Sequence, residues 1–380
     1  MTRPRAAVTF AFLIFGLGFG LWAGASAMVL QACGVTPLAY GVALTLAMLA
    51  NMAAQSCSGW LARHIPPRRL LMAALLATGA VLCAILLSLT AEALYAAVIV
   101  FGVTGGLLDN AVNAEGARVE AKLGRPILAG LHGAASLGVA VGAVSGSFAA
   151  ARAGLLPVAL FELAAFGAAA LAVARMTPAR PLSAARPARQ YGEARFARPL
   201  VALGLVVGAT TAGEAAANMW GASLLAQDAP QLAAIAGAGT SFFAACQATM
   251  RFCADGLRRR FDDFSIIAVS LAVAACGFAL VALNSGFAVS LCGFAIIGLG
   301  AGAVVPCAYA LALASSRLPV ASVLSGVSLF AGLLRVPGPL AMGALAQTLS
   351  IAAAFGLFAL LFAAALLLLA TMLKAREARA

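Results

Sequence analysis

The amino-acid sequence predicts an all-α membrane protein with twelve transmembrane helices in two pseudo-symmetric six-helix bundles. Hydrophobic residues make up 64% of the chain and charged residues only 9%, whereas soluble domains carry about 25% charged residues. Apolar runs long enough to cross about 30 Å of hydrocarbon recur from one end of the chain to the other. One long polar segment separates six of these runs from the other six.

The predicted spans are separated mostly by short loops. They cover residues 7–31, 39–62, 69–90, 93–117, 127–151, 155–175, 199–225, 231–253, 264–284, 286–314, 320–346 and 350–373. The first run is too long for the hydrophobic region of a signal peptide, so we interpret it as an uncleaved helix. Residues 176–198 are rich in Pro, Ala and Arg and lack an apolar face, which predicts a cytoplasmic linker. The expected domains are an N-terminal bundle at 1–175, the linker at 176–198 and a C-terminal bundle at 199–380.

The basic residues predict how the chain is oriented. With the N-terminus inside, every Lys and Arg lies in an inner segment except Arg152, in an outer loop, and Arg335, within a span. Such an excess of positive charge marks the cytoplasmic side. We therefore expect a multi-pass protein of the inner membrane with both termini in the cytoplasm. The net charge of +12 then reflects the orientation of the chain in the membrane, where anionic lipid attracts the basic segments, and it is not a sign of nucleic-acid binding.

Several other classes of protein are disfavoured. The sequence contains no nucleophile–base motif, no HExxH and no phosphate-binding GxxxxGK(S/T) loop, which argues against an enzyme and an ATP-driven pump. The eight cysteines are scattered without a CxxC pair, so we expect core residues and neither a metal nor a cofactor. A channel is disfavoured relative to a carrier because the chain is built from two repeated halves. A transport-like membrane sensor is a distant alternative.

The two halves repeat weakly. A shift of 196 residues places Gly102 and Gly106 on Gly298 and Gly302, and Leu61 and Arg63 on Leu257 and Arg259. The fourth and tenth spans, and the loops after the second and eighth, therefore occupy matching places. Six plus six helices around a central cytoplasmic loop is the layout of a two-bundle transporter, whose site lies at the bundle interface.

Over essentially its whole length the chain resembles a major facilitator superfamily transporter. The family signature G-x-x-x-D-R-x-G-R-R/K corresponds to Gly59 through Arg69, with Arg63 at the aspartate position and Pro66 at the glycine position. The loop after the eighth span keeps an acidic residue followed by arginines. The resemblance implies loops that latch neighbouring helices during gating, formed by Gly59, Arg63, Arg68, Arg69, Asp255, Arg258 and Arg259.

A narrower resemblance is to a branch of fucose-permease-like sugar/proton symporters and uncharacterised bacterial inner-membrane proteins. Its marks are Asp109 followed by Asn113 in the fourth span, and His132 followed by Ser-Leu-Gly in the fifth. In the seventh span Glu214 and Trp220 fit the pattern E-G-x-x-x-D-W, while a methionine, Met219, stands at the aspartate position. The resemblance implies a proton-coupled carrier.

Asp109, Asn113 and His132 are predicted to meet in the inner half of the protein. Asp109 and Asn113 share a helical face because they are four residues apart. Asp109 lies about 13 Å from the inner end of its span and His132 about 9 Å from the inner end of the next. A carboxylate beside an imidazole suits proton relay. A structural clamp between the two helices is the alternative.

Glu214 and Arg335 are predicted near the midplane, about 21 and 23 Å into their spans. An isolated charge there is costly, so a partner or a substrate must compensate it. Arg335 is the only arginine expected well inside a span, and its planar fork suits a carboxylate or phosphate. A static Glu214–Arg335 bridge and a substrate or proton site remain open alternatives. Arg152 and Glu162 are expected to form a structural pair near the outer surface.

Two patterns predict local helix geometry. The fifth span carries a stripe of small residues, similar to an antiporter signature, that favours close helix packing: Gly138, Gly142, Ala143 and Gly146. The eleventh span carries Pro337 and Pro339 on either side of Gly338, just past Arg335. This second pattern predicts a kink or a broken turn beside a cavity.

In the family that the chain resembles, spans 1, 4, 7 and 10 line the cavity. The substrate-binding candidates implied by this resemblance, together with Arg335, are Trp22, Asn110, Asn113, Asn218, Trp220 and Tyr309. We expect a monomeric secondary transporter that moves a small polar solute, sugar-like or an organic anion, by proton-coupled alternating access. The proton-coupling candidates are Asp109, His132 and Glu214. A proton-driven exporter of a metabolite, siderophore or drug is the alternative function.

Overall fold

Helices make up almost all of the structure, a computed structural model that describes residues 2–124, 127–176, 198–316, 318 and 320–377. Apart from its two end residues, the predicted linker at 176–198 lies outside the described residues. The first half contains α1 (Thr2–Ala32), α2 (Pro37–His64), α3 (Pro67–Leu86), α4 (Ala91–Leu123), α5 (Leu128–Ala153) and α6 (Leu155–Met176). The second half contains α7 (Arg198–Asp228), the 3₁₀ helix η1 (Pro230–Ile235), α8 (Ala238–Arg258), α9 (Asp263–Ala282), α10 (Phe287–Ala301), α11 (Val304–Ala314), α12 (Val320–Arg335), α13 (Gly338–Thr348) and α14 (Ile351–Glu377).

These helices account for the predicted crossings of the membrane. Within the described residues, 11 helical segments are long and apolar enough to span a bilayer. The remaining long helix is α8, which is more polar because it carries side chains such as Gln247 and Arg251. With α8 included, the fold has the predicted number of spans, and its class is that of an all-α membrane protein.

Two predicted spans are each built from two helices. The tenth is divided near Gly302 into α10 and α11, and the eleventh is divided at Val336 and Pro337 into α12 and α13. The second break confirms the one predicted from the prolines, because a proline has no N–H to continue the preceding helix. The predicted eighth span starts too early, since residues 230–235 form η1 and α8 begins at Ala238.

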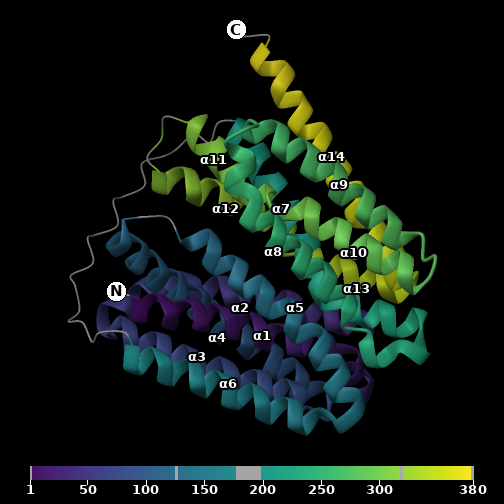
Figure 1. The fold of residues 1–380 in the computed structure, drawn as a ribbon. Helices are drawn as coiled ribbons and strands as arrows, with labels where there is room; N and C mark the ends of the chain where they lie inside the picture. Colours follow the sequence, from purple (N-terminus) through teal and green to yellow (C-terminus); the bar gives the residue numbers. More distant parts are fainter. Residues whose placement is uncertain (1, 125–126, 177–197, 317, 319, 378–380) are drawn as a thin grey trace.

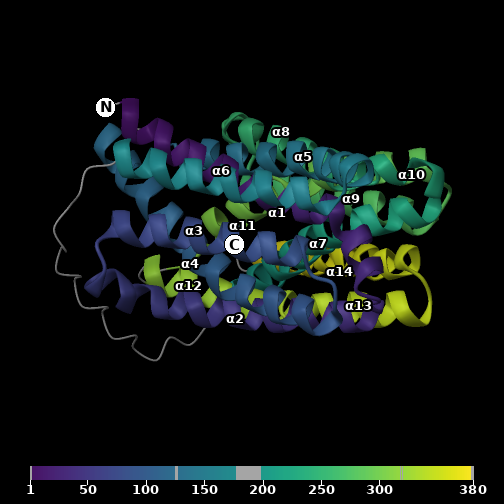
Figure 2. The same cartoon turned by 90° about the horizontal axis from the view of Figure 1, so that it is seen from below.

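The two halves form two lobes, the first lobe drawn in purple to teal and the second in green to yellow (Figure 1). The helices of the first lobe run side by side along one direction in the view from below (Figure 2). In this lobe α4 approaches α2 at Gly102, where an added Cβ would clash with the Ala47 backbone. In the second lobe α10 approaches α8 at Gly298, where an added Cβ would clash with the Phe243 backbone. These glycines are matched by the 196-residue shift, so the sequence repeat is also a repeat of packing.

Small residues bring α1 and α5 into backbone contact. A Cβ added at Gly142 would lie 2.9 Å from the Leu21 nitrogen, and one added at Gly20 would lie 2.9 Å from the Val139 Cα. The same close approach recurs along both helices, at Gly16, Gly24, Gly138 and Gly146. The small-residue stripe therefore has the packing role that its spacing predicts.

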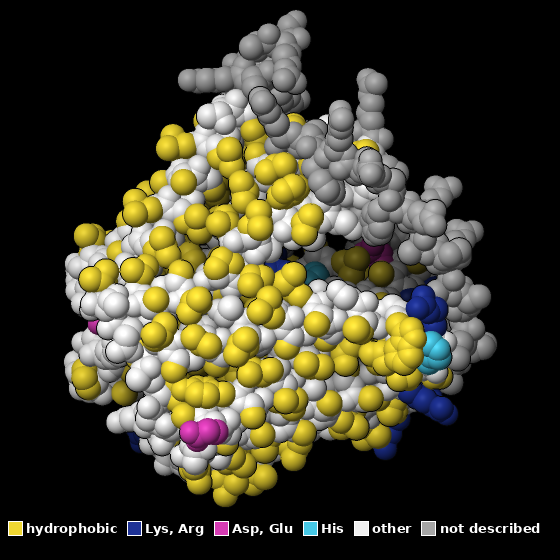
Figure 3. Space-filling model, turned by 180° about the vertical axis from the view of Figure 1, so that it is seen from behind, with side chains coloured by type: hydrophobic (Ala, Val, Ile, Leu, Met, Phe, Trp, Pro, Cys, Tyr) yellow, Lys and Arg dark blue, Asp and Glu magenta, His cyan; other side chains and the backbone are white. Residues whose placement is uncertain are grey.

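The lobes contact each other mainly through α5–α8, α2–α13 and α1–α7. Where α2 meets α13, a Cβ added at Gly41 would lie 3.0 Å from the Gly343 Cα. At the start of α8 the Gly237 N–H donates to Ser147 Oγ of α5 over 3.1 Å. We call the two contacts at Gly41–Gly343 and Gly237–Ser147 the outer seam, because they lie toward the helix ends opposite the basic ones. Figure 3 shows a hollow between the lobes in which basic, histidine and acidic side chains are visible.

Candidate functional site

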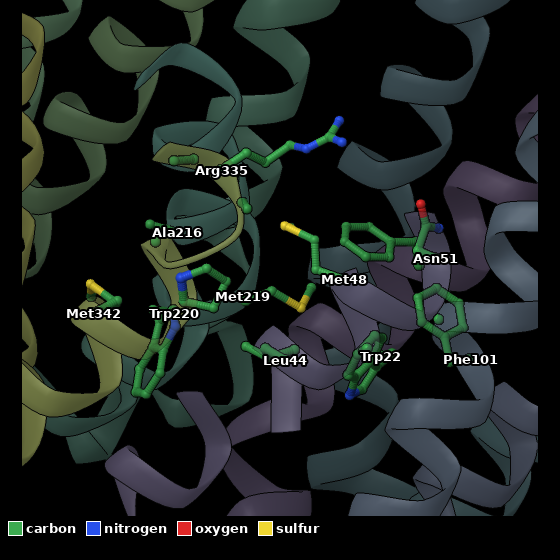
Figure 4. Close-up of a pocket in the computed structure, with 17 residues that line it drawn as sticks. Trp22, Leu44, Met48, Asn51, Phe101, Ala216, Met219, Trp220, Arg335 and Met342 are labelled. Carbon is green, nitrogen blue, oxygen red and sulfur yellow. The ribbon is translucent and has the colours of Figure 1, made fainter. Parts of the chain in front are cut away.

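A cavity of about 210 Å³ lies between the two lobes. The first lobe contributes residues of α1, α2 and α4, and the second contributes residues of α7, α12 and α13 (Figure 4). Most of the wall is apolar, and its large side chains are Phe19, Trp22, Leu44, Met48, Phe101, Met219, Trp220 and Met342. The cavity is thus a largely apolar chamber at the interface expected for a two-bundle carrier.

The aromatic side chains of the cavity are fixed by contacts with one another. The Trp22 ring meets the Phe101 ring edge to face, with centroids 5.1 Å apart, and meets Phe19 at 5.9 Å. Trp220 stands against Tyr40 of α2, with centroids 5.3 Å apart. Both tryptophans are only 2% exposed. Two of the predicted substrate candidates, Trp22 and Trp220, therefore line the cavity from opposite lobes.

Arg335 is the one charged side chain among the described residues that line the cavity. It is the last residue of α12, and in Figure 4 its side chain extends toward the first lobe. Its Nε atom is buried and has no hydrogen-bond partner within the described part of the chain. The N-terminus of α13, at Gly338 and Pro339, lies on the same wall and adds a partial positive charge. The positive charges on this wall therefore favour the binding of a negatively charged group.

On the first-lobe side of the cavity, a chain of hydrogen bonds leads from Asp109 to a lining residue. Its Oδ1 accepts from Asn113 Nδ2 over 2.9 Å, and its Oδ2 accepts from Gln55 Nε2 over 3.4 Å. Gln55 also donates to Asn51 Oδ1 over 2.9 Å, and Asn51 lines the cavity. The positive charge of Arg335 acts on the Asp109 carboxylate across the interface. Asp109 thus lies within the electrostatic range of Arg335 and is hydrogen-bonded to Asn113 on its own helix.

Glu214 is not paired with Arg335, so the static Glu214–Arg335 bridge, one of the two alternatives left open by the sequence, does not form in the structure. Its Oε2 lies 3.6 Å from Arg251 Nη2 of the neighbouring helix α8. Arg251 also donates from Nη1 to Ser136 Oγ of α5 over 2.7 Å. A second arginine therefore lies inside the bundle, where the sequence suggested only Arg335. It was assigned to the inner end of its span because three further arginines follow it closely.

His132 does not meet Asp109 either. Its ring packs edge to face on Phe12 of α1, with centroids 5.3 Å apart, and it lies within the electrostatic range of Arg251. The reason is the helix arrangement: α5 packs mainly on α1 and α8, whereas α4 packs mainly on α2 and α3. The consecutive helices α4 and α5 are therefore not close neighbours, and the predicted cluster of three side chains is divided between two places.

The remaining substrate candidates point elsewhere. Asn110 Nδ2 donates to Ser58 Oγ over 2.7 Å and thereby ties α4 to α2. Asn218 Nδ2 donates to the Glu214 carbonyl oxygen over 2.9 Å. The Tyr309 hydroxyl lies 2.9 Å from Ser328 Oγ and links α11 to α12. None of these three, nor Asn113, lines the central cavity.

The predicted gating residues form local contacts at the basic helix ends. Gly59 and Arg63 lie in α2, which runs to His64 with only two residues before α3. Arg68 donates to the Ala174 carbonyl oxygen at the end of α6 over 3.4 Å. Within the described part of the chain, no hydrogen bond or ion pair of Arg69 or Arg259 supports the predicted gating role.

In the second lobe, Arg258 forms an ion pair with Asp263 over 2.7 Å. Asp262 caps α9, and the hydrogen bonds from the Ser265 hydroxyl and N–H hold the pKa of its carboxyl below the usual range. The side chain of Asp255, the predicted acidic member of this loop, lies outside the described residues.

The predicted Arg152–Glu162 pair is wrong. Glu162 is 0% exposed, and neither of its carboxylate oxygens has a hydrogen-bond partner among the described residues. It faces α1 at Gly18, where an added Cβ would lie 2.5 Å from its Oε1. Arg152 instead stacks over the Phe148 ring at 5.2 Å. The first lobe therefore contains an isolated buried carboxyl group away from the cavity.

The sequence did not identify several polar residues of these clusters, although it held a signal for them. The missed residues include Asn51 and Gln55 on α2, and Gln247 and Arg251 on α8. The 196-residue shift that matches the glycines also places Asn51 on Gln247 and Gln55 on Arg251. In both lobes the second of these residues contacts a carboxylate on a neighbouring helix. Matching polar residues between the halves would have found them.

Comparison with known proteins agrees with this two-lobed architecture. Residues 8–334 match the Major Facilitator Superfamily, and the chain belongs to that family of membrane transporters. An uncharacterized transporter of Sinorhizobium fredii (strain NBRC 101917 / NGR234), y4wD, is 27% identical over 374 residues, covering 98% of this chain and 99% of that protein. The chain is thus similar to a transporter along its full length.

Solved structures show the same fold at low sequence identity. The nucleoside transporter NupG is 13% identical, with a TM-score of 0.75, and covers 98% of this chain and 100% of its own. The human organic anion transporter MFSD10 (TETRAN) is 17% identical, with a TM-score of 0.64, and covers 97% of this chain and 99% of its own. At these identities the likeness concerns the fold and not the solute.

Proposed function

We propose that the protein is a proton-coupled secondary transporter that binds a small organic anion in the central cavity and moves it by alternating access. The observation that carries this proposal is Arg335, whose buried Nε has no hydrogen-bond partner among the described residues and whose side chain lies on the wall of a cavity between the lobes. A guanidinium donates two parallel hydrogen bonds to a carboxylate. The partial positive charge at the start of α13 acts in the same direction.

Of the two solute classes considered from the sequence, an organic anion fits this cavity better than a sugar. Apart from the guanidinium of Arg335, the described lining residues include one side-chain amide, that of Asn51. Its Oδ1 already accepts a hydrogen bond from Gln55. Each buried hydroxyl left without a partner costs about 1–3 kcal/mol. Most hydroxyls of a sugar would lack partners on walls built from aromatic and methionine side chains.

Proton coupling follows from the position of Asp109. In the empty carrier the Asp109 carboxylate attracts Arg335. An anionic solute must compete with this carboxylate for the guanidinium. A proton on Asp109 removes the competition, so that proton and solute bind together, with one proton for each negative charge carried. Gln55 and Asn113 hold the carboxyl group in place in both states. On this proposal Glu214 and His132 have structural roles away from the cavity, Glu214 beside Arg251 and His132 against Phe12.

The proposal also assigns the two faces of the molecule. The basic helix ends face the cytoplasm, and the outer seam at Gly41 and Gly343 faces the other side of the inner membrane. The hollow seen in Figure 3 then belongs to a state that is closed outside and open inside. The transporting unit is a monomer, because both halves of the site lie in one chain.

Flux into proteoliposomes under an imposed pH gradient tests this function. We expect accumulation of organic anions but not of neutral sugars, and loss of solute binding in Arg335→Ala. Asp109→Asn should keep solute exchange and lose proton-driven accumulation, because its side chain cannot take up a proton. Its solute affinity should also become independent of pH. Accumulation of a neutral sugar that persists in Arg335→Ala would exclude the proposed site.

A further inference from the structure

We infer that the transported anion is an amphipathic monocarboxylate, with its carboxylate on Arg335 and an aromatic or similarly apolar body between the tryptophans of the two lobes. This inference rests on the proposed function and names the solute class of the same cavity. It is carried by three properties of the described residues: the composition of the walls, the number of charged groups and the volume of the chamber.

The walls select an apolar body. Trp22 and Phe101 on one lobe, and Trp220 on the other, line the chamber (Figure 4). Met48 and Met219 lie between them, and their flexible, polarisable side chains adapt to a ring placed at the centre. An aromatic solute in this position gains ring–ring contacts beyond the burial of its apolar surface.

The charges select one negative group at one end. Arg335 is the single cation among the described lining residues, so a second carboxylate on the solute would lack a partner. The far end of the chamber, between Trp22 and Trp220, has no charged lining residue. The solute is therefore anionic at one end and uncharged at the other.

The volume limits the size of the body. The chamber of about 210 Å³ has the volume of about seven molecules of liquid water, at roughly 30 Å³ each. This is enough for a single ring with a short acidic side chain and too little for a fused polycyclic drug-sized molecule, whose pockets typically exceed about 300 Å³. Phenylacetate combines one ring with one carboxylate and is the probe that matches all three properties.

The intrinsic fluorescence of the protein measures binding directly. The chain contains three tryptophans, and two of them, Trp22 and Trp220, line the cavity. The third, Trp60, is 55% exposed and stacks on His64. Replacing Trp60→Phe leaves the two cavity tryptophans as reporters in the otherwise complete chain. Phenylacetate, its neutral analogue phenylacetamide and the polar monoanion gluconate are then titrated separately into this variant in detergent.

We expect phenylacetate to change the emission and to bind at least tenfold more tightly than either comparison compound. In the same background Arg335→Lys should weaken phenylacetate binding at least tenfold and leave the weak phenylacetamide binding unchanged, which also shows that the cavity is still folded. Arg152→Lys is the matched control, because Arg152 stacks on Phe148 outside the cavity. Its phenylacetate affinity should equal that of the background.

Other outcomes of these titrations would refute different parts of the inference. Gluconate that binds as tightly as phenylacetate, with both depending on Arg335, refutes the apolar body and leaves the organic-anion proposal standing. Phenylacetamide that binds as tightly as phenylacetate refutes the carboxylate contact, and the absence of any phenylacetate response at 10 mM, on the order of a weak carrier affinity, refutes the inference as a whole. If phenylacetate binds through Arg335 but is not accumulated under a proton gradient, the proposed transport fails while the site assignment holds.

Discussion

Replacing Arg251 by methionine removes the guanidinium that lies 3.6 Å from Glu214 in the interior of the second lobe. At this distance Coulomb's law gives about 5 kcal/mol for an effective dielectric constant of about 20. The two side chains are 25% and 16% exposed, so solvent screening reduces the net coupling to about 2–3 kcal/mol. We expect Arg251→Met to destabilise the protein by at least this amount, because it removes the ion-pair partner of Glu214 and also the hydrogen bond to Ser136.

A double-mutant cycle isolates the pair. Glu214→Gln, Arg251→Met and the double variant are purified in detergent, and their unfolding is followed by heating. The entropy of unfolding scales with chain length, so 1 kcal/mol corresponds to roughly 1 °C for a chain of this size. The double variant should lose no more stability than the worse single variant, which gives a coupling of about 2–3 kcal/mol.

The control cycle pairs Glu214→Gln with Arg335→Met. The effects of these two changes should add to within about 0.5 kcal/mol, because the two side chains have no contact in the structure. Coupling between Glu214 and Arg335, together with additivity between Glu214 and Arg251, would refute the arrangement of charges described above. It would restore the bridge that the sequence first suggested.

Three further changes test other parts of the structure. Glu162→Met should raise stability by about 1–4 kcal/mol in thermal unfolding, because an unpaired buried carboxyl group is replaced by an apolar side chain of similar size; a loss of stability would reveal a partner of that carboxyl. Asp262→Ala should cost about 1 kcal/mol at pH 7 through loss of the α9 cap. Since the cap lowers the carboxyl pKa, its contribution to stability is present above about pH 4 and disappears as the pH falls through the folded-state pKa. If the Asp262→Ala variant were still about 1 kcal/mol less stable than the unmodified protein well below pH 3, this cap would be contradicted. Gly41→Leu should separate the outer seam, abolish transport and shift the Trp220 emission to longer wavelength; normal flux would show that the seam tolerates a side chain.

The sequence predicts those parts of the fold that depend on one helix at a time. Span lengths follow from the thickness of the bilayer. The break after Arg335 follows from Pro337, and the Asp109–Asn113 contact follows from the four-residue spacing. Each of these properties is fixed within a few residues of chain, so no knowledge of neighbouring helices is needed.

The sequence fails where the identity of the neighbouring helix decides the contact. His132 and Asp109 lie on consecutive helices at similar depth, yet α5 turns its polar face to α8 and α4 turns its own to α2. The sequence predicts Glu162 near the outer surface because it flanks the hairpin between the fifth and sixth spans, but its helical face is directed at Gly18 of α1. Depth along a helix can be counted from the sequence. Direction around the helix depends on the packing of the whole lobe.

The backbone contact between α1 and α5 has a mechanical consequence. Helices joined at glycine after glycine cannot slide or rotate against each other without severe overlap, so the first lobe behaves as a stiff frame. The second lobe has two interrupted helices, near Gly302 and at Pro337, and an interruption bends more easily than a continuous helix. A cycle of opening and closing would then be unequal, with one lobe carried as a rigid body and the other bending internally. The bending point at Pro337 is two residues from Arg335. Bending of the second lobe there would therefore also change the direction in which the Arg335 guanidinium points.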